Sequence, residues 1–221
     1  MVSVVMFSVP SLLRLKEHKA LSDITLSGRV LDLGGDKNSE YLEFFKGQFE
    51  TATVNVSERT RPDIIHDLEK PLPVPDASYD HVLLFNVLEH IFEYRALLAE
   101  ALRVMKPGGS IVVVVPFLFP VHPSPQDYRR FTASALRKEL EMLGLQNVSV
   151  RVLGGGVFAA RYLLLDRLLP RPLRLLNFYT SRYLACALDA LLVLVSRVLG
   201  KKYDPETYAL GYCAVAKKLK M

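Results

Sequence analysis

The spacing of apolar residues along the chain alternates between the short runs of a strand and the wider period of a helix. Short apolar runs bounded by Gly, Pro, Asn or Asp predict strands, whereas apolar positions three or four apart predict helices. The expected strands are residues 29–33, 51–56, 63–66, 79–85, 110–115, 147–153 and 208–216. The expected helices are residues 11–21, 39–46, 91–105 and 132–143. Strands that alternate with helices predict a mostly parallel α/β sheet.

The composition of individual runs adds detail to this sheet. Residues 110–115 are nearly all Val and Ile, which is typical of a strand covered on both faces, so we expect this strand to be central. Residues 208–216 alternate only loosely and are expected to form a terminal edge strand. Residues 106–109, Lys-Pro-Gly-Gly, predict a turn.

A leucine-rich stretch, residues 158–199, lies between the last two expected strands. Pro170 and Pro172 break it into at least two helices. As a helix, residues 183–199 would be about 25 Å long, short of the ~30 Å hydrocarbon core of a membrane, so we do not expect a transmembrane span. The stretch is instead expected to be a cap over an acceptor site or a dimer interface, with an interfacial membrane contact as the less favoured alternative.

Composition and charge exclude several classes of protein. Of 221 residues, 50% are hydrophobic and 23% are charged, which indicates an ordered domain with a sizeable core. Cys186 and Cys213 are too few for a disulfide framework and form no metal-binding pair, and residues 1–10 lack a secretory signal, so a cytoplasmic protein is expected. The net charge of +5 comes with arginines in the leucine-rich stretch rather than a basic track with aromatics, so we expect no nucleic-acid partner.

The first strand ends in an acidic residue followed by two glycines. Asp32, Gly34 and Gly35 stand where the backbone must turn tightly and approach a ligand, although a plain glycine turn explains this segment equally well in isolation. The later glycines that let a helix N-terminus hold a pyrophosphate are missing. The pattern therefore favours a ligand without phosphate over a dinucleotide.

Further segments occur in a fixed order after this one. The series is Leu-Asp-Leu-Gly-Gly at 31–35, His-Asp-Leu at 66–68, Pro-Leu-Pro at 71–73, Ser-Tyr-Asp at 78–80, Asn-Val-Leu-Glu-His at 86–90 and Glu-Ala-Leu-Arg-Val-Met-Lys-Pro-Gly-Gly at 100–109. On these motifs, residues 29 to about 145 resemble the class I S-adenosylmethionine-dependent methyltransferases, in particular the small single-domain branch with a Leu-Glu-His motif. The combination is far more specific than any single motif, because order and spacing must agree.

The resemblance implies a fold and a division of the chain. The fold would be α/β, a Rossmann-like doubly wound, mostly parallel sheet with an antiparallel terminal strand and a helical C-terminal insertion. The expected division is an N-terminal helical segment at 1–28, a Rossmann-like methyltransferase core at 29–155, a helical insertion at 156–203 and a terminal strand at 204–221 that completes the core sheet.

The resemblance also implies a cofactor site for S-adenosylmethionine. Asp32, Gly34 and Gly35 would line the methionine end, Asp67 and Leu68 would face the adenine, and Asn86, Val87 and Leu88 would floor the pocket beneath the sulfonium. The family usually grips both ribose hydroxyls with a carboxylate where this chain has Asn55. An amide binds more weakly there, and Glu58 is an alternative ribose contact. Asp36 also follows Gly35 where the family has a further glycine, which leaves the shape of the loop open.

The candidate catalytic residues are His122 and His90. His122 lies in a proline-rich loop, residues 116–131, that is expected to overhang the pocket and to bind the acceptor, although an ordinary surface loop with an Asp127–Arg129 or Asp127–Arg130 pair is the alternative. Either histidine would accept a proton from an acceptor hydroxyl, and His122 ranks first on its placement. For His90 and its neighbour Glu89, a structural role at a helix start is the favoured alternative. No metal site is expected.

These observations predict methyl transfer from S-adenosylmethionine to a small-molecule or glycan acceptor, at an atom that the sequence does not identify. The apolar, arginine-edged insertion suggests a lipid-linked or anionic glycan. Two rivals remain: a catalytically inactive methyltransferase-like binding or scaffold protein, favoured by Asn55, and a nucleotide-dependent oxidoreductase. A homodimer and a peripheral membrane contact through the C-terminal helices are left open.

Overall fold

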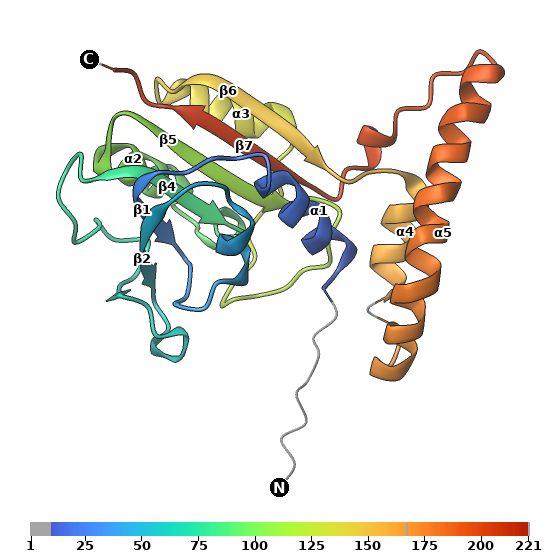
Figure 1. Cartoon of the computed structure of the whole chain (residues 1–221), viewed down its shortest axis with the longest axis horizontal. Coiled ribbons are helices and arrows are strands. Elements are labelled where there is room, and N and C mark those ends of the chain that lie inside the picture. Colours follow the sequence, from blue (N-terminus) through green and yellow to red (C-terminus); the bar gives the residue numbers. More distant parts are fainter. Residues whose placement is uncertain (1–9, 167, 221) are drawn as a thin grey trace, which may run out of the picture.

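A mixed sheet of seven strands forms the centre of the molecule in the computed structural model, which describes residues 10–166 and 168–220 (Figure 1). The strands are β1 (Gly28–Leu33), β2 (Phe49–Asn55), β3 (Ile64–Ile65), β4 (Tyr79–Phe85), β5 (Met105–Pro116), β6 (Gln146–Leu153) and β7 (Gly211–Lys217). Their order is β3-β2-β1-β4-β5-β7-β6, in which β1 to β5 pair in parallel and β7 is antiparallel to both of its neighbours. The predicted Rossmann-like, mostly parallel sheet with an antiparallel terminal strand is confirmed.

Helices cover both faces of this sheet. They are α1 (Leu12–Leu21), α2 (Tyr94–Val104), α3 (Ala133–Met142), α4 (Val157–Asp166) and α5 (Arg171–Val198), with short 3-10 helices η1 (Glu40–Phe44), η2 (Glu58–Thr60), η3 (Leu88–His90) and η4 (Pro205–Tyr208). Successive strand side chains point to opposite faces, so Val113 packs in the core on the side of α2 and α3. Val112 and Val114 pack in the core on the side of α1 and α4.

The positions of the last strands correct two expectations. The central place of residues 110–115 is confirmed, since β5 pairs with β4 and β7. The expectation that the last strand lies at an edge is wrong, because β7 inserts between β5 and β6 and leaves β6 outside. The predicted turn at 106–109 is also wrong. This segment is extended because it pairs with the chain after β7: Gly108 N–H donates to Lys218 O (3.1 Å) and Lys218 N–H donates to Gly109 O (2.9 Å).

Helix boundaries agree with the sequence where a capping side chain is present. Thr132 Oγ1 accepts a hydrogen bond from Ala135 N (3.1 Å) at the start of α3, as predicted, and Gly144 follows its end at φ +77°. The segment expected as a helix at 39–46 is the shorter 3-10 helix η1. Glu89 and His90 do not open α2 as expected, because they lie in η3, four to five residues before α2 begins at Tyr94.

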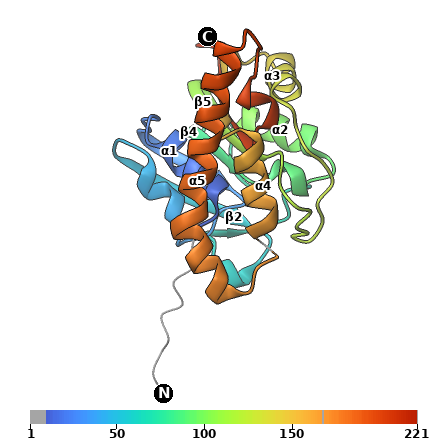
Figure 2. The same cartoon turned by 90° about the vertical axis from the view of Figure 1, so that its right-hand side faces the viewer.

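The leucine-rich stretch forms two helices, α4 and α5, as its prolines predict. α5 runs alongside α4 on the outside of the molecule (Figures 1 and 2). Within the described residues, Leu173–Val198 is apolar enough to cross a membrane, with a mean hydropathy of 1.4 and only 12% of its most apolar part buried. A 26-residue helix is about 39 Å long, whereas the length of about 25 Å expected from the sequence applies to residues 183–199 alone. The absence of a transmembrane span therefore stays a prediction that helix length does not decide.

Candidate functional site

A cavity of about 1200 Å³ opens at the ends of three neighbouring parallel strands. Gly34 and Gly35 follow β1, Asn86 follows β4 and Pro116 ends β5, and all four line the cavity. The carboxyl ends of parallel strands are where open α/β sheets bind ligands. Helix α1, η1 and the loop 116–131 supply the other walls, so this loop overhangs the cavity as the sequence predicts.

Both glycines of the loop after β1 are required by their surroundings. Gly34 has φ +90°, and a Cβ there would lie 2.3 Å from Val87 Cγ2. A Cβ on Gly35 would lie 2.0 Å from the Asp32 carboxylate. No larger residue fits either position without displacing its neighbours, so the main chain lies bare at the cavity wall.

Asp32 lies beneath this loop and does not line the cavity. It is fully buried, and its Oδ2 accepts a hydrogen bond from the Tyr41 hydroxyl (2.6 Å). Its Oδ1 has no hydrogen-bond partner among the described residues. Burial raises the pKa of Asp32 to about 7, against the opposing effect of the Tyr41 hydrogen bond. Buried acceptors are normally paired, so a bound ligand with a hydrogen-bond donor would satisfy this oxygen.

Asn55 supports the glycine loop. Its amide nitrogen donates to Gly34 O (2.8 Å) and Gly35 O (3.2 Å), and its Oδ1 accepts from Ser57 N (3.0 Å). Both amide protons are therefore used within the protein, and one acceptor position remains for a ribose hydroxyl. The expected ribose contact stays a prediction. Glu58 lies in η2 and is not part of the cavity wall.

Asn86 connects the end of β4 to α1. It has φ +55°, its amide nitrogen donates to Glu17 Oε1 (3.0 Å), and its Oδ1 is buried without a described partner. Glu17 also forms an ion pair with Arg14 (3.3 Å). Burial raises the pKa of Glu17, although Arg14 and Asn86 oppose the shift. Asn86, which lines the cavity, thus carries an unsatisfied acceptor, in addition to Asp32 Oδ1 beneath the glycine loop.

Of the residues that the sequence assigns to the cofactor, Gly34, Gly35 and Asn86 line the cavity, whereas Asp67, Leu68 and Leu88, like Asp32, Asn55 and Val87, do not. Asp67 stands in the loop after β3, where its Oδ1 accepts from Glu69 N (3.0 Å) and its other oxygen pairs with Lys70 (3.6 Å). Leu68 and Leu88 are buried in the core on the side of α2. The adenine contacts proposed for Asp67 and Leu68 stay predictions.

Glu89, His90 and His122 form a compact group. Both histidines line the cavity, whereas Glu89 is fully buried. Glu89 Oε1 lies 3.7 Å from His90 Nε2 and 3.9 Å from His122 Nε2. Burial raises the pKa of Glu89 to about 8, and burial lowers the pKa of His122. The sequence named both histidines but did not predict that they meet.

The loop that carries His122 is fixed by its own polar residues. Asp127 pairs with Arg130, so of the two pairings that the sequence left open this one forms, and Arg129 instead donates to Ile91 O (2.7 Å). Asp127 Oδ2 also accepts from His122 N (3.0 Å). The hydrogen bond from Arg130 lowers the pKa of Asp127 to about 2, which keeps this ion pair charged at neutral pH.

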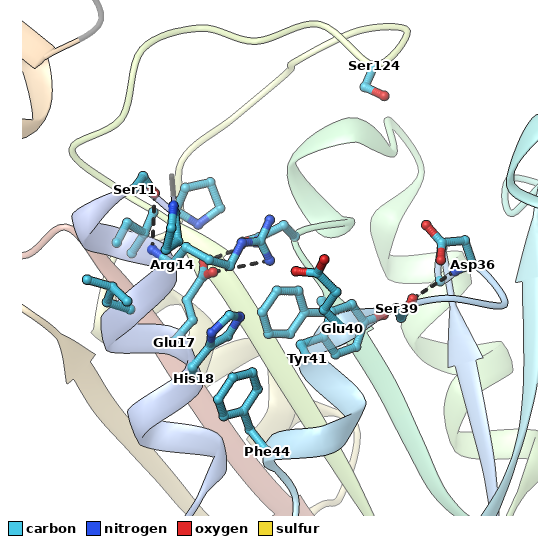
Figure 3. A pocket seen from close by; sticks show the side chains of 18 of the residues that line it. Ser11, Arg14, Glu17, His18, Asp36, Ser39, Glu40, Tyr41, Phe44 and Ser124 are labelled. Carbon is cyan, nitrogen blue, oxygen red and sulfur yellow. Dashed lines mark hydrogen bonds and ion pairs between the residues drawn. The ribbon is translucent and has the colours of Figure 1, made fainter. Parts of the chain in front are cut away.

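Sequence reasoning did not single out the residues of α1 and η1 that line the cavity. Arg14, Glu17 and His18 project from α1, and His18 stacks on Phe44 with ring centroids 3.9 Å apart (Figure 3). Tyr41, from η1, also lines the cavity. A signal was present, because residues 14, 17 and 18 share one helical face among leucines. Placing that face over the strand ends required the tertiary fold.

The comparisons with known proteins agree with this geometry. Residues 30–113 match the model of a methyltransferase domain family. A probable S-adenosylmethionine-dependent methyltransferase of Mycolicibacterium smegmatis is 35% identical over 92 residues, 39% of this chain and 36% of that protein. A demethylmenaquinone methyltransferase of Renibacterium salmoninarum is 37% identical over 94 residues, 38% of this chain and 40% of that protein. The chain thus matches little more than a third of the length of these relatives.

The fold is shared more widely than the sequence. The crystal structure of a Thermotoga maritima protein described as an S-adenosylmethionine-dependent methyltransferase, possible histamine N-methyltransferase, superposes with a TM-score of 0.58 at 15% identity. This superposition covers 94% of the chain and 91% of that protein. At this identity the likeness concerns the fold alone.

Proposed function

We propose that the chain is a class I S-adenosylmethionine-dependent methyltransferase, that its cavity binds S-adenosylmethionine and that it transfers the methyl group to a small-molecule acceptor. One observation carries this proposal: the bare glycine loop after β1, the unsatisfied Asn86 after β4 and the two histidines share a single cavity. Ligand and reacting groups would therefore meet at the strand ends.

The methionine end of the cofactor would lie at Gly34 and Gly35. Its ammonium group has three donors, and the buried Oδ1 atoms of Asp32 and Asn86 are acceptors that lack a described partner. The ribose would face the remaining acceptor position of Asn55, and the adenine would face Asp67 and Leu68 beyond β3. When bound, the cofactor supplies a methyl group on a positively charged sulfur.

The acceptor would lie beside His90 and His122, which line the same cavity. Methyl transfer is an in-line displacement, for which positioning alone can supply on the order of 7 to 11 kcal/mol. For a hydroxyl acceptor, His122 is the first candidate base because of its place in the loop 116–131, and His90 is the second. Burial lowers the pKa of His122, which favours the neutral ring that a base requires. No described residue of α4 or α5 lines this cavity, so the insertion does not cap it and gives no reason to prefer a lipid-linked glycan.

Calorimetric titration with S-adenosylhomocysteine tests the cofactor site. We expect wild-type binding, at least tenfold weaker binding for Asp67→Ala and for Asp32→Asn, and no change for Asp23→Asn, an exposed carboxylate paired with Arg151. Conversion of S-adenosylmethionine to S-adenosylhomocysteine with a panel of small hydroxyl and amine acceptors then separates the enzyme from the inactive binding protein. A wild-type chain that binds nicotinamide dinucleotides and not S-adenosylhomocysteine would overturn the proposal.

We propose a second role for α5, a contact with the surface of a membrane. Its inner face packs on α4 and includes the buried Asp189 and Ser196, whereas Leu176 and Leu194 are 63% and 58% exposed. Lys201 and Lys202 follow the helix and are exposed. An uncovered apolar face followed by cations is the pattern of a helix that lies in the interface of an anionic bilayer.

Sedimentation with vesicles tests this contact. Binding to vesicles that contain phosphatidylglycerol should exceed binding to phosphatidylcholine vesicles, and Leu176→Asp/Leu194→Asp should abolish it. Met142→Asp, on the exposed side of α3, is the matched control and should bind normally. If light scattering instead shows a dimer that the double substitution dissociates, the surface is an interface between two copies and the membrane proposal fails.

A further inference from the structure

The group formed by Glu89, His90 and His122 has the geometry of a metal site. One ligand atom from each side chain lies within 4.8 Å of the other two. Glu89 and His90 come from η3, after β4, and His122 comes from the loop after β5, so two different segments bring the three together. Glu89 is fully buried behind the histidines, which line the cavity.

Hydrogen bonds fix the tautomer of both histidines. His90 Nδ1 lies 2.5 Å from Gln126 O, and His122 Nδ1 lies 3.1 Å from Pro120 O. A carbonyl oxygen only accepts, so each Nδ1 carries the proton and each neutral ring keeps its lone pair on Nε2. A backbone carbonyl on the distal nitrogen is the usual partner of a metal-binding histidine, because it orients the ring.

The two Nε2 atoms lie beside the Glu89 carboxylate. Neither oxygen of Glu89 has a hydrogen-bond partner among the described residues, and its Oε1 lies 3.7 Å from His90 Nε2 and 3.9 Å from His122 Nε2. The carboxylate oxygen and the two Nε2 atoms thus point three electron-pair donors at one small region, which is the arrangement of ligand atoms that a cation binds.

We propose that Glu89, His90 and His122 bind a divalent first-row transition-metal ion such as Zn²⁺ or Mn²⁺. Two imidazoles and one carboxylate suit these ions, whereas Mg²⁺ and Ca²⁺ prefer oxygen ligands alone. Ion–ligand distances of about 2.1 Å place tetrahedral ligand atoms ~3.4 Å apart, so separations of 3.7 and 3.9 Å close with small side-chain shifts. Three protein ligands leave coordination positions open toward the cavity.

A bound ion changes the role of the histidines at the acceptor end of the cavity. This step rests on the proposed methyl transfer. An acceptor hydroxyl bound at an open position would release its proton to solvent water more readily, and its oxygen would then form the bond to the methyl carbon as the carbon–sulfur bond breaks, leaving S-adenosylhomocysteine. The ion uses the same Nε2 lone pairs that a base would use, so the ion replaces the histidine base.

Metal binding to tag-free, full-length protein that has been stripped with a chelator tests the site directly. Titration with Zn²⁺ and with Mn²⁺ should show one site per chain, and Co²⁺ should give the visible absorption bands of nitrogen and oxygen coordination. Glu89→Gln and His122→Ala should each weaken binding at least tenfold. His66→Ala, a histidine outside the group, is the control and should bind like wild type.

The same variants distinguish this proposal from the proposed function. Circular dichroism shows that each variant is folded, and S-adenosylhomocysteine titration reports on the cofactor site separately. Absence of a stoichiometric ion in wild type, or an affinity that Glu89→Gln and His122→Ala leave unchanged, overturns the metal site. If the ion is absent while S-adenosylhomocysteine still binds, methyl transfer with a histidine base remains. If the ion binds but S-adenosylhomocysteine does not, only the proposed function fails.

Discussion

Two regions of the molecule are equally rich in aliphatic residues but lie at opposite extremes of burial. In β5, residues 112–115 are valines that are 2% exposed or less. In α5, Leu176 is 63% exposed and Val198 is 79% exposed. The difference arises from the partners of each element, since β5 has a strand on both edges and helices over both faces, whereas the main neighbour of α5 among the described residues is α4, on one side (Figure 2). Apolar composition alone therefore does not fix burial.

The largest expected effect comes from placing a charge in each region. Val113→Asp puts a carboxylate in a site with no exposure and should cost more than about 5 kcal/mol or prevent folding. Leu194→Asp, at a position that is 58% exposed, should change the free energy of unfolding by no more than about 0.5 kcal/mol. Guanidinium denaturation measures both. A comparable loss in Leu194→Asp would mean that α5 is covered by a partner in solution.

The next largest effect is the pH dependence of stability that Asp32, the carboxyl group buried beneath the glycine loop, is expected to cause. The pKa of Asp32 is about 7 in the folded chain and 3.8 in an ordinary setting, so the unfolded chain releases this proton first as the pH rises. The free energy of unfolding should therefore fall between about pH 4 and pH 7, by an upper limit on the order of 4 kcal/mol. Below pH 4 both states are protonated, and above pH 7 the loss is complete.

Asp32→Asn isolates this contribution. Glu17 and Glu89 also have raised pKa values, so the wild-type curve contains their effects as well. The difference between the wild-type and Asp32→Asn curves removes these shared effects. A difference that does not change with pH would show that Asp32 is not buried as described.

The same contrast explains which parts of the fold the sequence could predict. Strands β1, β4 and β5 and helix α3 depend on local runs, apolar periods and a Thr132 cap, and their predictions are confirmed within a few residues. The position of β7 inside the sheet was not predicted, because the local sequence of a strand does not show whether it has a neighbouring strand on one edge or on both. The 106–109 segment was missed for a related reason, since its partner lies more than a hundred residues away.

The candidate site divides in the same way. The position of Gly34 and Gly35 at the cavity could be predicted, because a strand end and a backbone turn are local features of the sequence. The meeting of Glu89 with His122 was not visible, since it depends on two loops that only the sheet order brings together. The hydrogen bond between Tyr41 and Asp32 was not predicted, because it depends on the path of η1.

Two glycines with left-handed backbone separate crowding from backbone strain. Gly34→Ala meets both a φ of +90° and Val87 at 2.3 Å, so we expect a loss of about 2 to 4 kcal/mol and no measurable S-adenosylhomocysteine binding. Gly144→Ala has φ +77° but nothing within 4 Å, and should cost only about 1 kcal/mol. Thermal denaturation compares them. Equal losses would show that Val87 moves aside and that the loop tolerates a side chain.

A smaller loss than that of Gly34→Ala is expected in the helical insertion, where one charge interrupts an apolar helix. Asp189 of α5 accepts hydrogen bonds from Phe158 N (3.0 Å) and Ala159 N (2.8 Å) at the start of α4. It thus acts as a helix cap supplied by a neighbouring helix, and Asp189→Ala should cost about 1 to 2 kcal/mol.

This loss should also be local. Amide exchange in the first turn of α4 should accelerate while β5 stays protected, because α4 packs on α1 and the sheet only from the outside. Ser196→Ala is the control, since the Ser196 hydroxyl donates its hydrogen bond to Val193 O within the same helix. Faster exchange throughout the sheet would mean that the insertion is part of the same cooperative unit as the core. In that case, the exposed face of α5 would belong to a structure on which the cavity itself depends.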